Sequence, residues 1–349
     1  MKPLSKQLTI IGAGPGGFTA AFLAADNGFK VTLIDAEPRL GGTCLHEGCI
    51  PSKTLLSIAK TIDQSKAAKK FGVHFDEPQI NLEEINAFKR GVILKLSNGL
   101  SQLCKQKKIE LVQGLASFID SKTIKIQKPD GSVQELTFKK CIIATGSQPI
   151  TLPFIPAGSK HVMFSSQALE LKEIPKTLLV VGGGYIGLEM ATIYAGLGSQ
   201  VTICEITEGI LGGTDKDLTA VLLRSLQKKI SDIKLSTAIK DIVSLDDGIE
   251  VTFNDAGNIT KQRFDKILIA TGRKPKLDVL RLKHTKVQVL NNGFINVKKG
   301  QQTDDKNIYA IGDVAPGPML AHKASYEANI AVDHILGKKI NTGQPIIPG

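Results

Sequence analysis

The sequence predicts an α/β fold in which one strand–turn–helix–strand plan is used twice. An apolar run at 8–11 leads into the glycine-rich turn Gly12–Gly17, then into a helical pattern and a second apolar run that ends at Asp35. The same order recurs from an apolar run at 178–181 through the turn Gly182–Gly187 to Glu205. In each copy the acidic residue stands 23 positions after the first glycine. Strands that alternate with helices in this way indicate a parallel sheet.

Further short repeats support this interpretation. Ala144–Gly146 and Ala270–Gly272 share the sequence Ala-Thr-Gly, and each closes an apolar strand. A later apolar strand, at 308–311, ends in Gly312-Asp313. The repeats indicate that the second copy of the plan is as complete as the first.

The chemistry of the glycine-rich turns is that of a dinucleotide site. Glycines let the backbone come close to a pyrophosphate, whose charge is stabilised at the N-terminus of the following helix. The carboxylates of Asp35 and Glu205 would accept hydrogen bonds from adenosine ribose hydroxyls. Because both glycine-rich turns stand in the same sequence context, the alternative that they have no function is less favoured. Glu205 also disfavours a 2′-phosphate by charge repulsion, so the second site is predicted to take NAD rather than NADP.

Composition limits the class of protein. The chain has 349 residues, which leaves room for two or three domains, and its 42% of hydrophobic residues exclude wholesale disorder. The net charge of +11, from 44 basic and 33 acidic residues, raises nucleic acid as a partner. The lysines are scattered along helical stretches without aromatic interleaving. A solvated basic surface is therefore favoured, and no nucleic-acid partner is predicted.

The cysteine count and the N-terminus bear on the compartment. Five cysteines in this length do not make a disulfide scaffold. The N-terminus leads directly into a strand without a signal peptide, and no apolar run reaches the ~18 residues that span a bilayer. We expect a cytoplasmic protein with no membrane partner.

Two long helices are expected between the two glycine-rich turns. One starts near Pro51, a residue suited to the first turn of a helix, and runs to about Lys70. The other opens at Asn81, with Glu84 three residues on as in a capping box, and continues towards Lys108.

The first of these helices follows a close pair of cysteines, Cys44 and Cys49. Two cysteines five residues apart cannot bridge on a regular helix, but Gly48 permits a kinked turn between them. Cys49 then stands at the start of the Pro51 helix, where the helix dipole favours a thiolate. An incidental pair and half a zinc site are the alternatives. A redox-active pair is favoured because no second ligand cluster appears, and no metal site is predicted.

These motifs together resemble the pyridine nucleotide-disulfide oxidoreductases. The segment 41–53 reads GGTCLHEGCIPSK and follows an N-terminal glycine turn of the kind that this family uses for its flavin. The two Ala-Thr-Gly segments, the second glycine turn, Gly312-Asp313 and the segment 319–324 (MLAHKA) match as well. Within the family the chain is most similar to the bacterial dihydrolipoamide dehydrogenases, and the resemblance covers essentially all 349 residues.

The resemblance implies two Rossmann-like dinucleotide-binding domains, with an NAD-binding domain inserted into an FAD-binding domain. The FAD-binding domain would comprise 1–148 and 274–349, and its end would begin a linker to an interface domain. The NAD-binding domain would comprise 149–273, entered through a linker marked by prolines at 149, 153 and 156. The tail at 343–349 is expected to be a loop.

The implied activity is that of the flavoprotein shared by 2-oxo acid dehydrogenase complexes. Dihydrolipoyl groups on an acyltransferase or carrier protein would be oxidised through a redox-active disulfide and FAD, with NAD⁺ as acceptor. Cys49 would be the thiol beside the flavin and Cys44 the thiol that exchanges with substrate. Lys53 would lie near the flavin, paired with Glu189. Two alternatives stay open: another disulfide or metal-ion reductase of the family, such as a mercuric reductase, and a non-catalytic FAD/NAD-binding fragment.

The matching positions also give the cofactor contacts that the resemblance implies. Those expected to hold FAD are Gly12, Gly14, Pro15, Gly16, Gly17, Asp35, Gly42, Thr43, Lys53, Gly114, Ala116, Thr145, Gly146, Asp313, Met319, Leu320, Ala321 and His322. Those expected to hold NAD are Gly182, Gly184, Tyr185, Ile186, Gly187, Glu205, Ala238 and Gly272.

The chain departs from the common pattern at three places. His46-Glu47 stands where the family usually has Asn-Val, and a carboxylate there could change the disulfide's potential unless it is an exposed loop residue. Tyr185 stands where dihydrolipoamide dehydrogenases usually have an aliphatic residue and glutathione reductases a tyrosine that covers the flavin. A packed aromatic at the helix start is the alternative for Tyr185.

The third departure concerns the end of the chain. Full-length family members are homodimers whose further interface domain carries a His-Glu pair that protonates the exchange thiol of the partner subunit. None of the six histidines here lies in a matching His-Pro motif, and the chain ends where that domain would begin. We therefore expect these 349 residues by themselves to be impaired in lipoamide turnover.

Overall fold

The computed structural model describes residues 7–156, 158–340 and 346–348 and separates into two compact units. The first unit comprises residues up to 46, 94–148 and from 274 onward; the second comprises 47–93 and 149–273. In this grouping by contacts, 47–93 lies with the second unit, whereas the domain bounds expected from the sequence, which stay a prediction, place all of 1–148 in one segment. The physical reason is that α3 (Cys49–Ala68) packs against α6 (Tyr185–Gly196) of the second unit, where a Cβ on Gly196 would come within 2.7 Å of the Cβ of Ala59.

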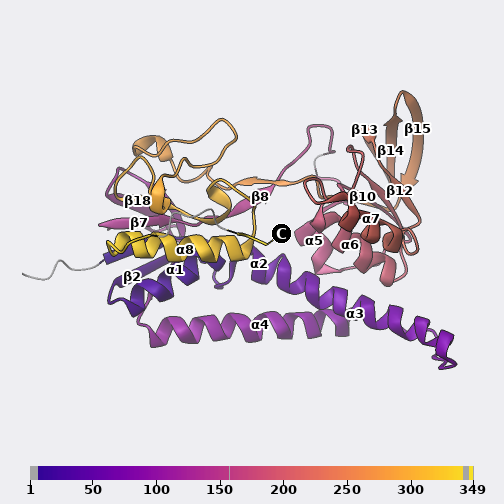
Figure 1. The fold of residues 1–349 in the computed structure, drawn as a ribbon, viewed down its shortest axis with the longest axis horizontal. Coiled ribbons are helices and arrows are strands. Elements are labelled where there is room, and N and C mark those ends of the chain that lie inside the picture. Colours follow the sequence, from indigo (N-terminus) through magenta and orange to yellow (C-terminus); the bar gives the residue numbers. More distant parts are fainter. Residues whose placement is uncertain (1–6, 157, 341–345, 349) are drawn as a thin grey trace, which may run out of the picture. The chain divides into compact units, whose positions relative to one another are not determined.

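The first unit is built on a parallel sheet with the strand order β18-β7-β1-β2-β3. Its strands are β1 (Gln7–Ile11), β2 (Lys30–Asp35), β3 (Glu110–Gln113), β7 (Lys140–Ile143) and β18 (Ile308–Ala310). Helices α1 (Pro15–Asp26) and α8 (Ala321–Ile335) lie side by side on one face of this sheet (Figure 1). Strands β1, β7 and β18 are buried along almost their whole length, as expected of a sheet covered on both faces.

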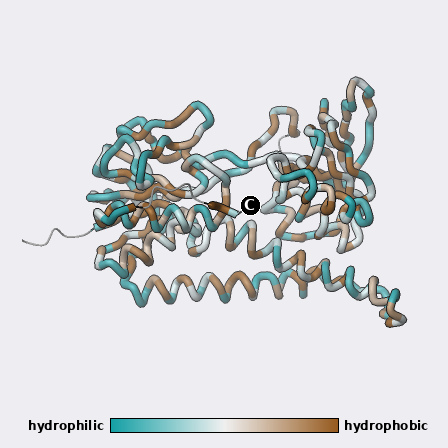
Figure 2. The backbone as a smooth tube through the Cα atoms, viewed as in Figure 1, coloured by the Kyte–Doolittle hydropathy of each residue, from teal (hydrophilic) through white to brown (hydrophobic). Residues whose placement is uncertain are grey.

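The second unit repeats this arrangement with the order β12-β11-β10-β16-β9, also parallel. Its strands are β9 (Val162–Phe164), β10 (Thr177–Val181), β11 (Gln200–Cys204), β12 (Asp232–Lys234) and β16 (Lys266–Ile269). The register is also repeated, since Gln7 pairs with Lys30 and Thr177 pairs with Gln200. The hydrophobic cores of the two units include residues of both parallel sheets, and Figure 2 shows hydrophobic residues distributed through both units. The predicted α/β fold with two parallel-sheet repeats is confirmed.

Smaller elements complete the units. Two antiparallel sheets, β4-β5-β6 and β13-β14-β15, and a strand pair, β8 with β17, accompany the parallel sheets. These strands are β4 (Leu115–Phe118), β5 (Thr123–Gln127), β6 (Val133–Thr137), β8 (Ser147–Pro149), β13 (Thr237–Leu245), β14 (Gly248–Asp255), β15 (Asn258–Phe264) and β17 (Arg273–Pro275). The other helices are α2 (Gly42–His46), α4 (Leu82–Gln106), α5 (Ser165–Glu170) and α7 (Lys216–Leu226), with 3₁₀ turns η1 (Lys69–Phe71), η2 (Leu282–His284), η3 (Lys299–Gln301) and η4 (Gly312–Val314).

The long helices differ from the prediction at their ends. α3 begins at Cys49, two residues before the expected Pro51, because Gly48 forms its N-cap. Pro51 fits inside the first turn because the N–H groups there have no partner within the helix. Of the tail predicted as a loop, residues 346–348 have no regular secondary structure, and the others lie outside the described residues.

The N-terminus of α4 carries the predicted asparagine cap in a modified form. The side-chain oxygen of Asn81 accepts hydrogen bonds from the N–H groups of Glu83 at 3.0 Å and Glu84 at 3.3 Å. The carboxylate of Glu84 accepts a bond from the Asn81 side-chain amide at 2.9 Å, rather than from its backbone as in a capping box. The cap therefore fixes where α4 starts.

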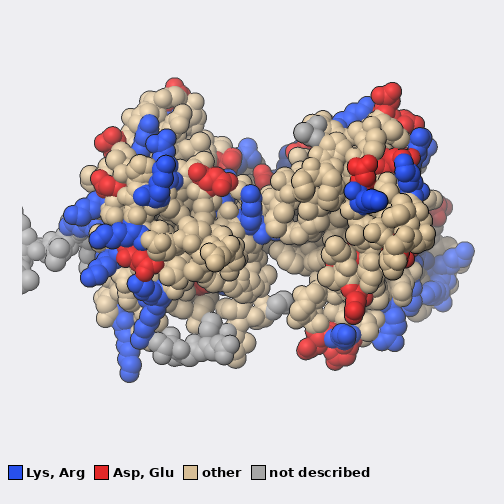
Figure 3. Space-filling view, turned by 90° about the horizontal axis from the view of Figure 1, so that it is seen from above, with Lys and Arg blue, Asp and Glu red and all other residues tan. Residues whose placement is uncertain are grey.

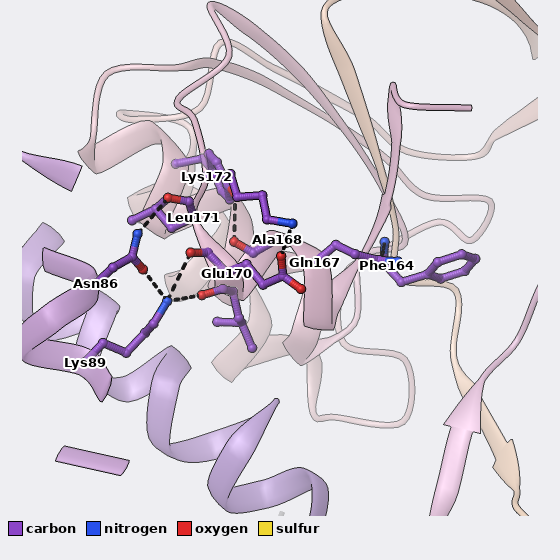
Figure 4. A network of polar contacts seen from close by, with 10 residues as sticks. Asn86, Lys89, Phe164, Gln167, Ala168, Glu170, Leu171 and Lys172 are labelled. Atoms are coloured by element: carbon purple, nitrogen blue, oxygen red, sulfur yellow. Dashed lines mark hydrogen bonds and ion pairs between the residues drawn. The ribbon is translucent and has the colours of Figure 1, made fainter. Parts of the chain in front are cut away.

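A buried lysine ties α4 to the C-terminal end of α5 (Figure 4). Lys89 is 5% exposed, and its ammonium donates to the carbonyl oxygens of Leu169 and Glu170 and to the side chain of Asn86. The Asn86 amide donates in turn to the carbonyl of Leu171 at 3.0 Å. Burial, assisted by the nearby Arg90 cation, lowers the pKa of Lys89 to about 8. The network supplies donors for the last carbonyls of α5, which have no partner within the helix.

We expect Lys89→Met to lower the free energy of unfolding by about 1–3 kcal/mol, because it leaves buried carbonyl groups of α5 without a donor. Lys172→Met is the matched control, since Lys172 forms an exposed ion pair with Glu170 at 2.6 Å beside the same helix end. The control should change stability by less than about 0.5 kcal/mol. Urea denaturation followed by far-UV circular dichroism measures both, and equal effects of the two variants would contradict this role of Lys89.

Candidate functional site

The first glycine-rich turn is held in place by a carboxylate. The N–H of Ala13 donates to Oδ2 of Asp35 at 2.5 Å, and the N–H of Glu37 donates to Oδ1 at 2.8 Å. Gly12 has a φ of +102°, and a Cβ there would lie 2.2 Å from the carbonyl oxygen of Ala144. A Cβ on Gly17 would lie 1.8 Å from the carbonyl oxygen of Gly12. Only glycine therefore fits at these two positions.

The second turn has the same geometry. The N–H of Gly183 donates to Oε2 of Glu205 at 2.6 Å, and Oε1 accepts the N–H of Thr207 at 2.9 Å. Gly182 has a φ of +112°, and a Cβ there would lie 2.4 Å from the carbonyl oxygen of Ala270. A Cβ on Gly187 would lie 2.1 Å from the carbonyl oxygen of Gly182. The equal spacing in the sequence thus corresponds to equal contacts in the structure.

Each glycine-rich turn leads into a helix whose N-terminus is suited to bind an anion. The N-caps Gly14 and Gly184 provide no side-chain hydrogen bond, and neither α1 nor α6 has an acidic residue in its first turn. A Cβ on Gly184 would meet nothing within 4 Å, and one on Gly14 would meet only the Cα of Gly42 at 3.9 Å. A positive helix end with no side-chain cap and with open space beside its N-cap glycine fits the pyrophosphate of a dinucleotide.

The carboxylate beside each turn has acceptor positions left for a ribose hydroxyl. Such a group offers about four acceptor positions. Asp35 uses two of them on backbone N–H groups, and Glu205 uses three, since the hydroxyl of Thr207 also donates to Oε1 at 2.8 Å. Both side chains are partly exposed. Each carboxylate can therefore hold its turn and still accept a hydrogen bond from a ligand hydroxyl.

Other predicted residues of the first unit gather around the first turn. A Cβ on Gly42 would lie 2.7 Å from the Cα of Gly14, so the start of the cysteine segment crosses directly over the turn. The N–H of Gly114 donates to the carbonyl oxygen of Asp35 at 2.7 Å. Thr145 follows Ala144 beside Gly12, and its hydroxyl donates to the carbonyl of Lys276 at 2.8 Å. Pro15 is the first residue of α1, and Thr43 in α2 is exposed.

Two of the predicted contact residues in the first unit can contact a ligand only through their backbone. Ala116 is buried in the hydrophobic core of this unit, so only its backbone is suited to contact a ligand. Gly146 has a φ of +72°, and its carbonyl accepts the N–H of Lys276 at 2.9 Å. Both positions are therefore defined by the backbone rather than by side-chain chemistry.

The predicted C-terminal contacts lie around the start of α8. Asp313 lies in η4, and its Oδ2 accepts the hydroxyl of Ser147 at 2.6 Å. Met319 and Leu320 precede α8, with Leu320 as its N-cap, and Ala321 is its first residue. The ring of His322 is hydrogen-bonded through Nε2 to the carbonyl oxygen of Pro348 at 2.8 Å.

The remaining predicted residues of the second unit surround the second turn. Tyr185, at the start of α6, is 49% exposed, which argues against the packed-aromatic alternative. Ile186 is half-buried beside it. Ala238 follows Thr237, whose N–H donates to the carbonyl of Glu205 at 3.0 Å. Gly272 has a φ of +128°, and its carbonyl accepts the N–H of Ile150 at 3.0 Å.

The predicted pair of Lys53 and Glu189 is present within the second unit. Nζ of Lys53 donates to Oε1 of Glu189 at 2.7 Å. The other carboxylate oxygen accepts the hydroxyl of the buried Ser52 at 2.9 Å. Ser52 is not among the predicted site residues, and its position beside Lys53 is the feature of the sequence that could identify it. Because Ser52 and Lys53 lie in the first turns of α3, both are fixed to the helix that Cys49 begins.

The two cysteines of the motif stand on either side of a break in the helical backbone. Cys44 lies in α2, and Cys49 is the first residue of α3. Gly48 between them is not helical, with φ −146° and ψ −109°. The first turn of α3 contains no acidic residue, so its positive end favours the thiolate of Cys49. Glu47 is exposed, which favours the interpretation of the His46-Glu47 departure as a loop feature.

The other three cysteines differ from this pair in their surroundings. Cys104, Cys141 and Cys204 are buried in the hydrophobic cores, whereas Cys44 and Cys49 are both partly exposed. Burial raises the pKa of Cys104 to about 11 and that of Cys204 to about 12, and it raises the pKa of Cys141 further. These three thiols stay protonated at neutral pH, so thiol chemistry belongs to Cys44 and Cys49.

Three further features of the described residues bear on the sequence expectations: the charged surface, the grouping of metal-ligand residues and the apolar character of the helices. Figure 3 shows Lys and Arg spread over the visible face of both units, with Asp and Glu interspersed. In the part of the chain that the structure describes, no three His, Cys, Asp or Glu side chains are grouped for a metal ion. None of the helices in residues 7–156, 158–340 and 346–348 combines the length and apolar character needed to span a bilayer.

Comparison with known sequences matches this arrangement to a family of enzymes. The family model described as pyridine nucleotide-disulphide oxidoreductase matches residues 6–328. The dihydrolipoyl dehydrogenase of Haemophilus influenzae is 41% identical over 99% of this chain, which spans 72% of that relative. The enzyme of the same name from Geobacillus stearothermophilus is 40% identical over 96% of this chain, which spans 70% of that relative.

Solved structures agree with the sequence comparison. LpdA from Mycobacterium tuberculosis matches with a TM-score of 0.89 and 26% identity, over 96% of this chain and 73% of that one. The HOCl-induced flavoprotein disulfide reductase RclA from Escherichia coli matches with a TM-score of 0.84 and 29% identity, over 96% and 72%. Dihydrolipoyl dehydrogenases and their family use FAD and NAD(H), the ligands that the two turns fit. The chain therefore belongs to the pyridine nucleotide-disulphide oxidoreductase family.

Proposed function

We propose that this protein is a dihydrolipoyl dehydrogenase that oxidises dihydrolipoyl groups on an acyltransferase or carrier protein, with NAD⁺ as the final acceptor. The observation that carries the proposal is the cysteine motif, in which Cys49 begins α3, the helix that also carries Ser52 and Lys53 with their bonds to Glu189. The relatives named dihydrolipoyl dehydrogenase, 40–41% identical, support this choice of substrate. Thiol exchange of this kind suits the reducing cytoplasm.

The two glycine-rich turns divide the cofactors between them in this proposal. The turn Gly12–Gly17 with Asp35 holds FAD, and residues 1–148 and 274–349 form its domain. The turn Gly182–Gly187 with Glu205 holds NAD, and 149–273 form its domain. Support comes from helix N-termini that have no side-chain cap and from the carboxylates that anchor each turn. When bound, FAD supplies a two-electron acceptor that passes a hydride on to NAD⁺.

The chain's own chemistry is thiol–disulfide exchange. In the oxidised protein Cys44 and Cys49 form a disulfide, and one thiolate of the dihydrolipoyl group attacks the sulfur of Cys44. The Cys44–Cys49 bond breaks, Cys49 leaves as a thiolate and a mixed disulfide forms. The second substrate thiolate then displaces Cys44. The substrate becomes a cyclic disulfide, the two cysteines gain its two electrons, and the two substrate protons pass to Cys44 and to solvent.

Ser52, Lys53 and Glu189 form a hydrogen-bonded network at the N-terminal end of α3, the helix that begins at Cys49. Glu189 fixes the ammonium of Lys53 through one carboxylate oxygen and is itself oriented by Ser52 through the other. The dipole at the N-terminus of α3, whose first turn has no acidic residue, favours the Cys49 thiolate. This arrangement keeps Cys49 as the better leaving group, so Cys44 is the sulfur that accepts substrate.

A second candidate function is the reduction of another disulfide or of a metal ion. The similarity to RclA, a flavoprotein disulfide reductase solved as a Cu(II) complex, favours this candidate. It would use the same two cysteines with electrons flowing from NADH. The two candidate functions differ in the direction of electron flow, because only the first takes electrons from a dithiol substrate.

We expect dihydrolipoamide, mixed without oxygen with the FAD-loaded chain, to produce a long-wavelength absorbance band from the Cys49 thiolate beside the flavin. The half-reaction is measured by stopped-flow spectroscopy and does not require NAD⁺ turnover. Cys49→Ser should abolish the band, whereas Cys44→Ser should show it without any substrate. The opposite pattern in the two variants would reverse the roles of the cysteines.

The control for this experiment is Cys104→Ala, which removes a buried thiol of the first unit and should leave the band unchanged. Glutathione and Cu²⁺ serve as comparison substrates. A band with NADH but none with dihydrolipoamide would overturn the proposed substrate in favour of the second candidate.

We expect Glu205→Ala to reduce the preference for NADH over NADPH by at least about tenfold, because it removes the like-charge repulsion of a 2′-phosphate. Both affinities should fall as well, since Gly183 and Thr207 lose their acceptor. Titration of each nucleotide against the purified protein gives the ratio, which is the decisive quantity.

Asp35→Asn is the matched control, because Asp35 makes the corresponding contact in the first unit. It should leave the NADH to NADPH ratio as in wild type while weakening FAD. A ratio that changes with Asp35→Asn and not with Glu205→Ala would contradict the assignment of the two turns.

A further inference from the structure

Two oppositely charged side chains are buried on the N-terminal half of α8. Lys323 is 4% exposed and Glu327 is 6% exposed, and Nζ of Lys323 lies 3.1 Å from Oε1 of Glu327. Burial raises the pKa of Glu327, and the Lys323 cation and the N–H of Gly312 partly offset this effect. A buried ion pair is weak evidence for stability, because desolvation opposes the attraction. The contacts of this pair indicate another role.

The pair holds both sides of one residue in the turn that precedes α8. Oε2 of Glu327 accepts the N–H of Gly312 at 2.7 Å, and Nζ of Lys323 donates to the carbonyl of Gly312 at 3.0 Å. Lys323 also donates to the carbonyl of Ala315 at 3.3 Å. With the bond to Glu327, all three ammonium protons are used. The backbone of Gly312, with a φ of +73°, is thus fixed from both directions.

The fixed residue is followed directly by Asp313. The Asp313 carboxylate accepts the hydroxyl of Ser147 at 2.6 Å. The side chain is therefore oriented by Ser147, and the backbone that carries it is set by Lys323 and Glu327.

The same turn of α8 also contacts the first glycine-rich turn. A Cβ on Gly312 would lie 3.0 Å from the Cβ of Ala324, and a Cβ on Gly16 would lie 3.2 Å from it. The hydroxyls of Thr19 in α1 and Ser325 in α8 lie 3.3 Å apart. Ala324 thus packs between the two segments, while its neighbour Lys323 holds one of them.

We propose that Lys323 and Glu327 are positioning residues that set the Gly312-Asp313 turn at a fixed place relative to the turn Gly12–Gly17, and so preorganise the FAD site. The inference rests on the proposed flavin contacts of these two turns. It deepens that proposal because it assigns a flavin-binding role to two residues that contact no predicted ligand.

The test measures FAD affinity of the apoprotein by quenching of flavin fluorescence. Glu327→Gln keeps the size of the side chain but replaces one carboxylate oxygen by an NH₂ group, which faces a donor of either Gly312 or Lys323. The dissociation constant of FAD should therefore rise at least about tenfold. Asp333→Asn is the matched control, since Asp333 lies on α8 in an exposed ion pair with Lys338 at 2.8 Å. It should change FAD affinity by less than about twofold. NADH affinity should stay as in wild type for both variants.

A double variant separates positioning from stability. Lys323→Met with Glu327→Leu replaces the charges by apolar groups, which often restores the stability of a fold that has lost a buried ion pair. The melting temperature of the apoprotein should therefore recover more than FAD affinity does, because the peptide groups of Gly312 still lack their partners.

Two results would overturn the inference. One is an FAD affinity of Glu327→Gln within twofold of Asp333→Asn. The other is a double variant that regains both melting temperature and FAD affinity, since the pair would then only support the fold. No dihydrolipoyl group enters these measurements, so a failure of the proposed substrate leaves the result intact.

Discussion

A hydrogen bond from a glycine-rich turn to a carboxylate at the end of the next strand is the contact on which both units depend. It joins Ala13 to Asp35 and Gly183 to Glu205, at 2.5 and 2.6 Å. The bond fixes the turn that leads into α1 and α6, beside the open space at the N-cap glycines Gly14 and Gly184. It also fixes the carboxylate beside that space. The position of the turn and the place of the carboxylate at the candidate ligand site both depend on this bond.

The repeat of the contact explains why the fold was predictable. Apolar runs of four or five residues, closed by Gly-x-Gly, encode parallel strands that are buried on both faces. Gly12 and Gly182 are required because a Cβ would strike a carbonyl oxygen of the neighbouring strand end. A local pattern in the sequence therefore reports a contact between segments more than a hundred residues apart for Gly12 and about ninety apart for Gly182.

Other features depend on contacts that no local pattern reports. Lys89, Lys323 and Glu327 are charged residues in helices, where a solvated face is the usual expectation, yet each is buried. Their partners are mainly backbone carbonyl and N–H groups, which carry no residue identity that a sequence could show. Ser52 was missed because its hydroxyl orients Glu189 from a buried position on α3, and burial of a serine in a helix has no signal in the sequence. The packing of α3 on α6 also had no signal in the order of the motifs.

The central claim is that the two equivalent turns bind different dinucleotides. Amide hydrogen–deuterium exchange of the chain, measured with FAD alone and with NADH alone, tests it most directly. FAD should slow exchange in Gly12–Gly17 and at Gly312-Asp313, and NADH should slow exchange in Gly182–Gly187. Protection of the second turn by FAD, or of the same turn by both ligands, would contradict the account.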